Sequence, residues 1–142
     1  MTVETLPPII VQFETPASAV DAWAALTDPA LVAEWFTDAT PVGAVGDPYR
    51  LDFGDGSVVE GVIRAVERGH SFAYTWAWVD ADPPTETLVT WTVEPLPDGS
   101  GRVTLIHDGW LEAGADAATR ADHEGYWTGY LEDLAALLAE DD

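Results

Sequence analysis

Apolar and polar positions alternate along several short stretches in the middle of the chain, which is the pattern of half-buried strands. This period-two alternation predicts strands at residues 9–14, 49–53, 58–67, 71–78, 87–94 and 103–107. Turn sequences separate several of them, including Asp55-Gly56, Arg68-Gly69 and the stretch at residues 97–101. Strands joined by such short turns are typical of an antiparallel sheet.

Helical spacing appears at the two ends of the chain. Pro16 stands where the first turn of a helix tolerates proline, and Thr15 before it is the expected N-cap. A short second helix is expected at residues 30–35. The longest apolar stripe recurs every three or four residues at His123, Trp127, Tyr130, Leu131, Leu134, Leu137 and Leu138.

This order of elements predicts the class α+β, because strands form one run and helices flank it. We expect a curved antiparallel sheet of six strands wrapped on the long C-terminal helix, with two short helices between strands one and two. No internal repeat or linker interrupts the pattern, so residues 1–142 are expected to form a single domain.

One strand is unusually rich in aromatic residues. Phe72, Tyr74, Trp76 and Trp78 occupy alternate positions and therefore share one face, while the other face carries small residues. A face with this much ring surface is typical of a strand that borders a concave apolar site.

Charge narrows the possible partners. The chain has 26 acidic residues against five basic ones, all arginine, and a formal net charge of −21. Nucleic acid and anionic membrane surfaces are therefore not expected as partners, because both bind through lysine and arginine. The acidic surface indicates either plain solubility or adaptation to high salt. The absence of cysteine and of a long apolar run favours a cytoplasmic protein without disulfides.

A series of local segments resembles the SRPBCC, or START-like, superfamily, and within it the group homologous to the Aha-type activator of the heat-shock chaperone ATPase. The segments are WAALTDP (23–29), EWF (34–36), FGDGSVVEG (53–61), FAYTWAW (72–78), residues 89–99, LIHDGW (105–110) and HEGYWTGYLEDL (123–134). The resemblance implies the helix-grip fold, with a deep pocket between the sheet and the terminal helix. The family commonly has glycine before the terminal-helix tryptophan, where this chain has Tyr126.

Ten residues are expected to line that pocket, and the alternative for each of them is a plain core residue. Trp35 is the expected gate at the open end of the sheet. The full set is Trp35, Tyr49, Phe53, Tyr74, Trp76, Trp91, His107, His123, Trp127 and Tyr130.

His107 and His123 are the candidate catalytic residues, because each is expected to point inward and could serve as a general acid or base. The alternative is that both are hydrogen-bonded core residues. The three histidines lie on separate elements without the spacing of metal ligands, and no phosphate-binding or nucleophile motif is present, so no metal or cofactor is expected.

The leading hypothesis is a non-catalytic protein that binds a small apolar or aromatic molecule. The first alternative is a module that binds a chaperone or another protein, and the second is an enzyme resembling polyketide cyclases and dehydratases. The sequence leaves a monomer and a homodimer equally open.

Overall fold

The structure is a computed structural model that describes residues 7–54, 56–79, 86–110, 115 and 117–140. Its elements follow the order expected from the hydrophobic pattern. They are β1 (Ile9–Thr15), α1 (Ala19–Thr27), α2 (Pro29–Trp35), β2 (Asp38–Ala39), β3 (Pro48–Asp52), β4 (Val58–Glu67), β5 (Ser71–Trp78), β6 (Thr87–Pro95), β7 (Gly101–Asp108) and α3 (Ala117–Glu140).

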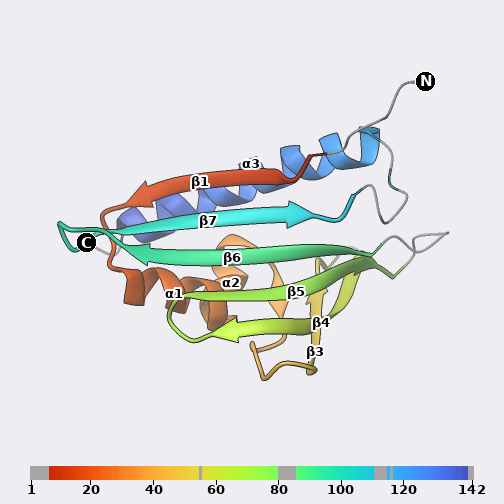
Figure 1. The fold of residues 1–142 in the computed structure, drawn as a ribbon, viewed down its shortest axis with the longest axis horizontal. Helices are drawn as coiled ribbons and strands as arrows, with labels where there is room; N and C mark the ends of the chain where they lie inside the picture. Colours follow the sequence, from red (N-terminus) through yellow and green to blue (C-terminus); the bar gives the residue numbers. More distant parts are fainter. Residues whose placement is uncertain (1–6, 55, 80–85, 111–114, 116, 141–142) are drawn as a thin grey trace.

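The strands form one curled antiparallel sheet in the order β1-β7-β6-β5-β4-β3-β2, with α3 running alongside β1 and β7 (Figure 1). This arrangement confirms the expected α+β helix-grip architecture. The strand count of six was wrong, because β2 adds a seventh strand. It pairs Asp38 with Asp52 and Ala39 with Leu51. A two-residue strand contains no alternation, so no pattern in the sequence could reveal it.

The two short helices are capped by side chains. Asp28 accepts a hydrogen bond from the Ala30 amide at 3.0 Å and begins α2. Ser18 accepts from the Asp21 amide at 3.2 Å and begins α1. The expected cap at Thr15 was therefore wrong: Thr15 ends β1, is buried, and accepts a hydrogen bond from the Ala17 amide instead.

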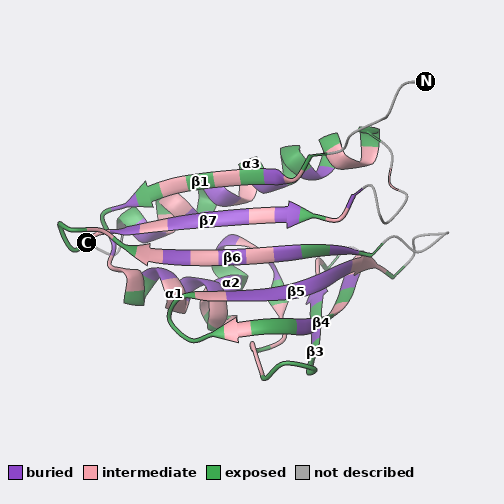
Figure 2. Cartoon of the chain, viewed as in Figure 1, coloured by how far each residue is buried: buried purple, intermediate pink, exposed green. Residues whose placement is uncertain are grey.

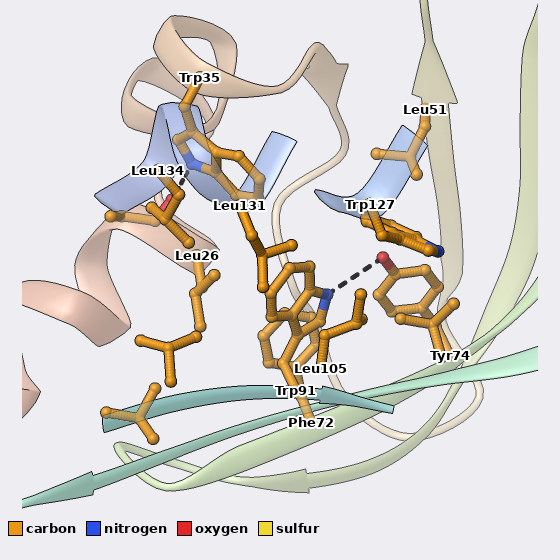
Figure 3. Packing of buried hydrophobic residues seen from close by; sticks show 14 of the residues in the cluster. Leu26, Trp35, Leu51, Phe72, Tyr74, Trp91, Leu105, Trp127, Leu131 and Leu134 are labelled. Carbon is orange, nitrogen blue, oxygen red and sulfur yellow. Dashed lines mark hydrogen bonds between the residues drawn. The ribbon is translucent and has the colours of Figure 1, made fainter. Parts of the chain in front are cut away.

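The core lies between the sheet and the helices (Figure 2). Leu131 and Leu134 of α3 belong to this cluster, together with Trp91 and Leu105 of the sheet and Trp35 of α2 (Figure 3). Burying side chains of this size stabilises a fold by about 1.5–3 kcal/mol each. Helix α3 is thereby fixed against the sheet, and the rings of His123 and Trp127 in its N-terminal half contact Trp78 and Trp76 of β5.

Within the described ranges, no helix combines the length and the apolar character that crossing a bilayer requires.

Candidate functional site: an aromatic pocket

A pocket of about 520 Å³ lies where the N-terminal half of α3 faces β5 and the ends of α2 and β3. We call it the aromatic pocket, because seven of its eleven described lining residues are phenylalanine, tyrosine or tryptophan. The lining residues are Phe36, Thr37, Phe53, Ser57, Trp76, Trp78, Asp122, His123, Tyr126, Trp127 and Tyr130.

Two periodicities bring these rings together. Strand β5 places Trp76 and Trp78 on the same face, since side chains alternate along a strand. Helix α3 presents His123, Trp127 and Tyr130 on one face, because residues three and four apart are neighbours on a helix. The pocket therefore lies between a strand face and a helix face, each with its own regular spacing.

Phe36 joins the walls of the pocket. This residue caps the C-terminal end of α2, and its ring centroid lies 5.5 Å from Phe53, 5.4 Å from Trp127 and 4.8 Å from Tyr130. Aromatic pairs at such separations are favourable beyond the area they bury. The aromatic wall is therefore held by ring–ring contacts as well as by the backbone.

His107 lies behind the pocket and uses both ring nitrogens. The indole N–H of Trp127 donates to Nδ1 at 2.9 Å, and Nε2 lies 2.6 Å from the hydroxyl of Thr87. Since Nδ1 accepts, the ring proton is on Nε2 and is donated to Thr87. Burial, with a smaller effect from the nearby His123, lowers the pKa of His107 to about 2. The ring is therefore neutral at physiological pH.

His123 lines the pocket and has a similar arrangement. The indole N–H of Trp78 donates to Nε2 at 2.9 Å, so the ring proton is on Nδ1, which lies 2.8 Å from the Thr119 carbonyl. Burial lowers the pKa of His123, and the Thr119 carbonyl and the Asp122 carboxylate oppose that shift. Both histidines thus accept a hydrogen bond from an indole and donate one elsewhere.

Trp76 carries a buried polar group that has no hydrogen-bond partner. Its side chain lines the pocket and is only 4 % exposed. Among the described residues, its indole nitrogen is the buried side-chain polar atom that has no hydrogen-bond partner. Buried donors are almost always paired in proteins, so this N–H stands out.

The structure places five of the ten predicted site residues on the pocket lining: Phe53, Trp76, His123, Trp127 and Tyr130. The other five lie in the surrounding core. Trp35, the expected gate, is buried and donates its indole N–H to the Ala25 carbonyl at 2.8 Å.

Three of the remaining four, Tyr49, Tyr74 and Trp91, form a buried cluster beside the pocket, and His107 is described above. Trp91 donates to the hydroxyl of Tyr74 at 3.3 Å, as the dashed line in Figure 3 shows. The rings of Tyr74 and Tyr49 lie 4.3 Å apart. Burial raises the pKa of both tyrosines, so their hydroxyls stay protonated.

Six lining residues were not among the ten predicted ones: Phe36, Thr37, Ser57, Trp78, Asp122 and Tyr126. The place of Trp78 in the lining could have been predicted, because it shares the aromatic face of β5 with Trp76. The place of Tyr126 could also have been predicted, since it lies three residues after His123 on the same helix. Phe36, Thr37 and Ser57 lie outside regular elements, where no periodicity marks them.

No group of three or more histidine, cysteine, aspartate or glutamate side chains within the described residues has a metal-binding arrangement.

Solved structures similar to this one share its fold. The protein MLL2253 from Mesorhizobium loti is 26 % identical, with a TM-score of 0.84 over 95 % of this chain and 98 % of that one. DynU16, a protein of the dynemicin biosynthetic locus, is 25 % identical with a TM-score of 0.83 over 94 % of this chain. This chain spans 48 % of the DynU16 chain. The Aha1 dimer from Colwellia psychrerythraea is 18 % identical, with a TM-score of 0.78 over 94 % of this chain and 97 % of that one.

No curated protein matches the chain. The family model described as "Activator of Hsp90 ATPase homolog 1-like protein" matches residues 16–139, which is most of the sequence. Together with the fold, this match confirms the resemblance seen in the local segments. The chain belongs to the Aha-type family of the SRPBCC superfamily.

Proposed function

We propose that this protein binds a small apolar or aromatic molecule in the aromatic pocket and performs no committed catalysis there. The observation that carries the proposal is the pocket itself, about 520 Å³ in volume and lined mainly by rings. Sites for small molecules are typically concave, mostly apolar and between about 300 and 1,000 Å³. Rings that already contact one another lose little freedom when a ligand arrives, which favours binding.

The histidines support binding rather than chemistry. A general acid or base must have a nitrogen within hydrogen-bond reach of the substrate. In His107 and His123 both ring nitrogens already have partners within the protein. Either residue would have to break one of these bonds before it could exchange a proton with a ligand, so the cyclase-like alternative is the weaker one.

Thermal unfolding followed by circular dichroism tests the proposal with 2-acetylnaphthalene as the probe. A ligand that binds only the native state raises the unfolding midpoint as its concentration rises. Trp78→Ala should weaken that stabilisation, because Trp78 lines the pocket. Trp23→Ala is the matched control: Trp23 is also half-buried, but it packs on Phe72 and is not among the lining residues.

The proposal is wrong if the probe leaves the midpoint of the wild type unchanged up to its solubility limit. Equal loss of stabilisation in the two variants would also contradict it, because the effect would then not depend on the pocket.

A second candidate is a module that binds a chaperone, and the description of the family favours it. The net charge of −21 would require a basic face on that partner. Adding the protein to a purified Hsp90-type ATPase and measuring ATP hydrolysis tests this candidate. Stimulation that survives in the Trp78→Ala variant would indicate a partner surface separate from the pocket. Sedimentation velocity distinguishes monomer from homodimer, the state reported for the Colwellia protein.

A further inference from the structure

The indole N–H groups of the core are satisfied with one exception. Trp76 alone, among the described buried tryptophans, donates to nothing, and its side chain lines the aromatic pocket. The paired donors and their acceptors are Trp35 with Ala25, Trp78 with His123, Trp91 with Tyr74, Trp110 with the His107 carbonyl, and Trp127 with His107.

The two imidazole rings beside Trp76 already use their acceptor nitrogens. Its ring centroid lies 5.4 Å from His107 and 6.1 Å from His123. Nδ1 of His107 accepts from Trp127, and Nε2 of His123 accepts from Trp78. The second nitrogen of each ring is a donor. Neither imidazole can therefore pair the Trp76 N–H without giving up an existing bond.

We infer that the Trp76 N–H is the polar anchor of the pocket and that the ligand presents a hydrogen-bond acceptor at its buried end. This inference rests on the proposed function and specifies its ligand class. Ligand sites commonly combine an apolar lining with a few polar groups that fix orientation. Here the anchor is a donor, so it selects molecules with a carbonyl oxygen, an ether oxygen or an aromatic nitrogen.

The acceptor is neutral rather than anionic. A buried carboxylate needs a cation or several donors to offset its lost hydration. None of the described lining residues is arginine, the chain contains no lysine, and the stretches outside the described ranges contain no arginine. The lining instead carries the Asp122 carboxylate, and the whole chain has a net charge of −21. Both repel an anion.

The nitrogen is shielded from solvent, so an acceptor reaches it only when a neighbouring ring moves aside. Side-chain rotamer changes of this kind are common when ligands bind. The ring of Trp78 stands at 89° to that of Trp76, with centroids 5.6 Å apart, and it is only half-buried. We expect rotation of the Trp78 ring to open this path, at the cost of its hydrogen bond to Nε2 of His123.

Three naphthalene probes of similar shape test the inference by titration calorimetry. 2-Acetylnaphthalene carries a neutral acceptor, 2-isopropenylnaphthalene replaces its oxygen by a methylene group, and 2-naphthoate carries an anionic acceptor. The wild type should bind the ketone roughly tenfold more tightly than the hydrocarbon, as expected for one neutral hydrogen bond in a buried site. It should bind the carboxylate most weakly.

Trp76→Phe keeps a ring at this position and removes the N–H. The ketone-to-hydrocarbon affinity ratio should then fall to about one, while the hydrocarbon still binds. Trp91→Phe is the matched control, because it removes an indole N–H outside the lining and should leave the ratio unchanged. An unchanged ratio in Trp76→Phe overturns the anchor but leaves the proposed function standing. If neither neutral probe binds the wild type, both proposals fall.

A measurement on the wild type alone covers the case in which Trp76→Phe does not fold. The carbonyl stretch of carbon-13-labelled 2-acetylnaphthalene shifts to lower frequency when its oxygen accepts a hydrogen bond. The bound ketone should absorb below its frequency in hexane. A bound frequency equal to that in hexane would overturn the inference.

Discussion

The indole N–H of Trp127 donates a hydrogen bond to Nδ1 of His107 across 2.9 Å, which ties α3 to β7. In a second bond of this kind, the indole N–H of Trp78 on β5 donates to Nε2 of His123 on α3, also at 2.9 Å. Two indole–imidazole bonds therefore connect the helix to two separate strands. Both histidines must remain neutral for these bonds to persist, because a protonated ring has no acceptor nitrogen.

We expect stability to fall on acidification because of His107. Its pKa is about 2 in the folded state and about 6.5 when unfolded, so the unfolded chain binds the extra proton between these values. The stabilisation is complete above pH 6.5 and is lost as the pH falls. The loss is about 1.4 kcal/mol per pH unit, or about 2 kcal/mol between pH 7.5 and 5.

His107→Gln isolates this effect in urea unfolding at the two pH values. The variant should be less stable at pH 7.5 by about 1–3 kcal/mol, because glutamine fits both partners imperfectly. Between pH 7.5 and 5, its free energy of unfolding should then fall by about 2 kcal/mol less than that of the wild type. His70→Gln is the control, since it removes an exposed histidine and leaves His107 and its partners in place. Identical pH dependence in His107→Gln and wild type would contradict this assignment.

Trp78→Phe should raise the pKa of His123 toward its ordinary value. The Trp78 N–H bonds only the neutral form of the ring, and the indole also contributes to its burial. Phenylalanine removes the donor and part of that burial, and both changes favour protonation. The titration of His123 followed by nuclear magnetic resonance measures the shift, with Trp23→Phe as the control. A pKa of His123 that stays the same or falls would show that the indole has no such role.

Gly61→Ala should destabilise the protein by about 2 kcal/mol or more. A Cβ at Gly61 would overlap the main-chain carbonyl of Thr75 on the adjacent strand, and backbone cannot move aside cheaply. Gly125→Ala is the contrasting variant. Gly125 is exposed on α3 with open space around it, so alanine there should stabilise by up to about 1 kcal/mol. Urea unfolding of both variants measures the difference, and a neutral Gly61→Ala would refute the steric argument.

The unfolding temperature should rise between low and molar potassium chloride. Repulsion within a chain of net charge −21 opposes the compact state, and salt screens it. Near pH 4.1, the calculated isoelectric point, the net charge is small and the effect of salt should shrink. A midpoint at pH 7 that does not respond to salt would remove the case for adaptation to high salt.

The sequence predicted the sheet and the terminal helix well, because both have one buried face with a regular period. Periodicity could not separate pocket residues from core residues, since it gives the face of an element and not the position of its neighbours. Tyr74 and Trp76 share a face of β5, yet Tyr74 lies in the solid core and Trp76 lines the pocket. That division depends on where α2 ends and where α3 crosses the strand, which only the packed structure reveals.

Three of the seven tryptophans, Trp76, Trp78 and Trp127, lie in the wall of the pocket. The protein thus contains its own optical reporter, because an occupant whose absorption overlaps indole emission will quench these three chromophores by energy transfer. Unlabelled protein can therefore be screened against mixed natural extracts by its ultraviolet fluorescence alone, before any candidate ligand has been chosen.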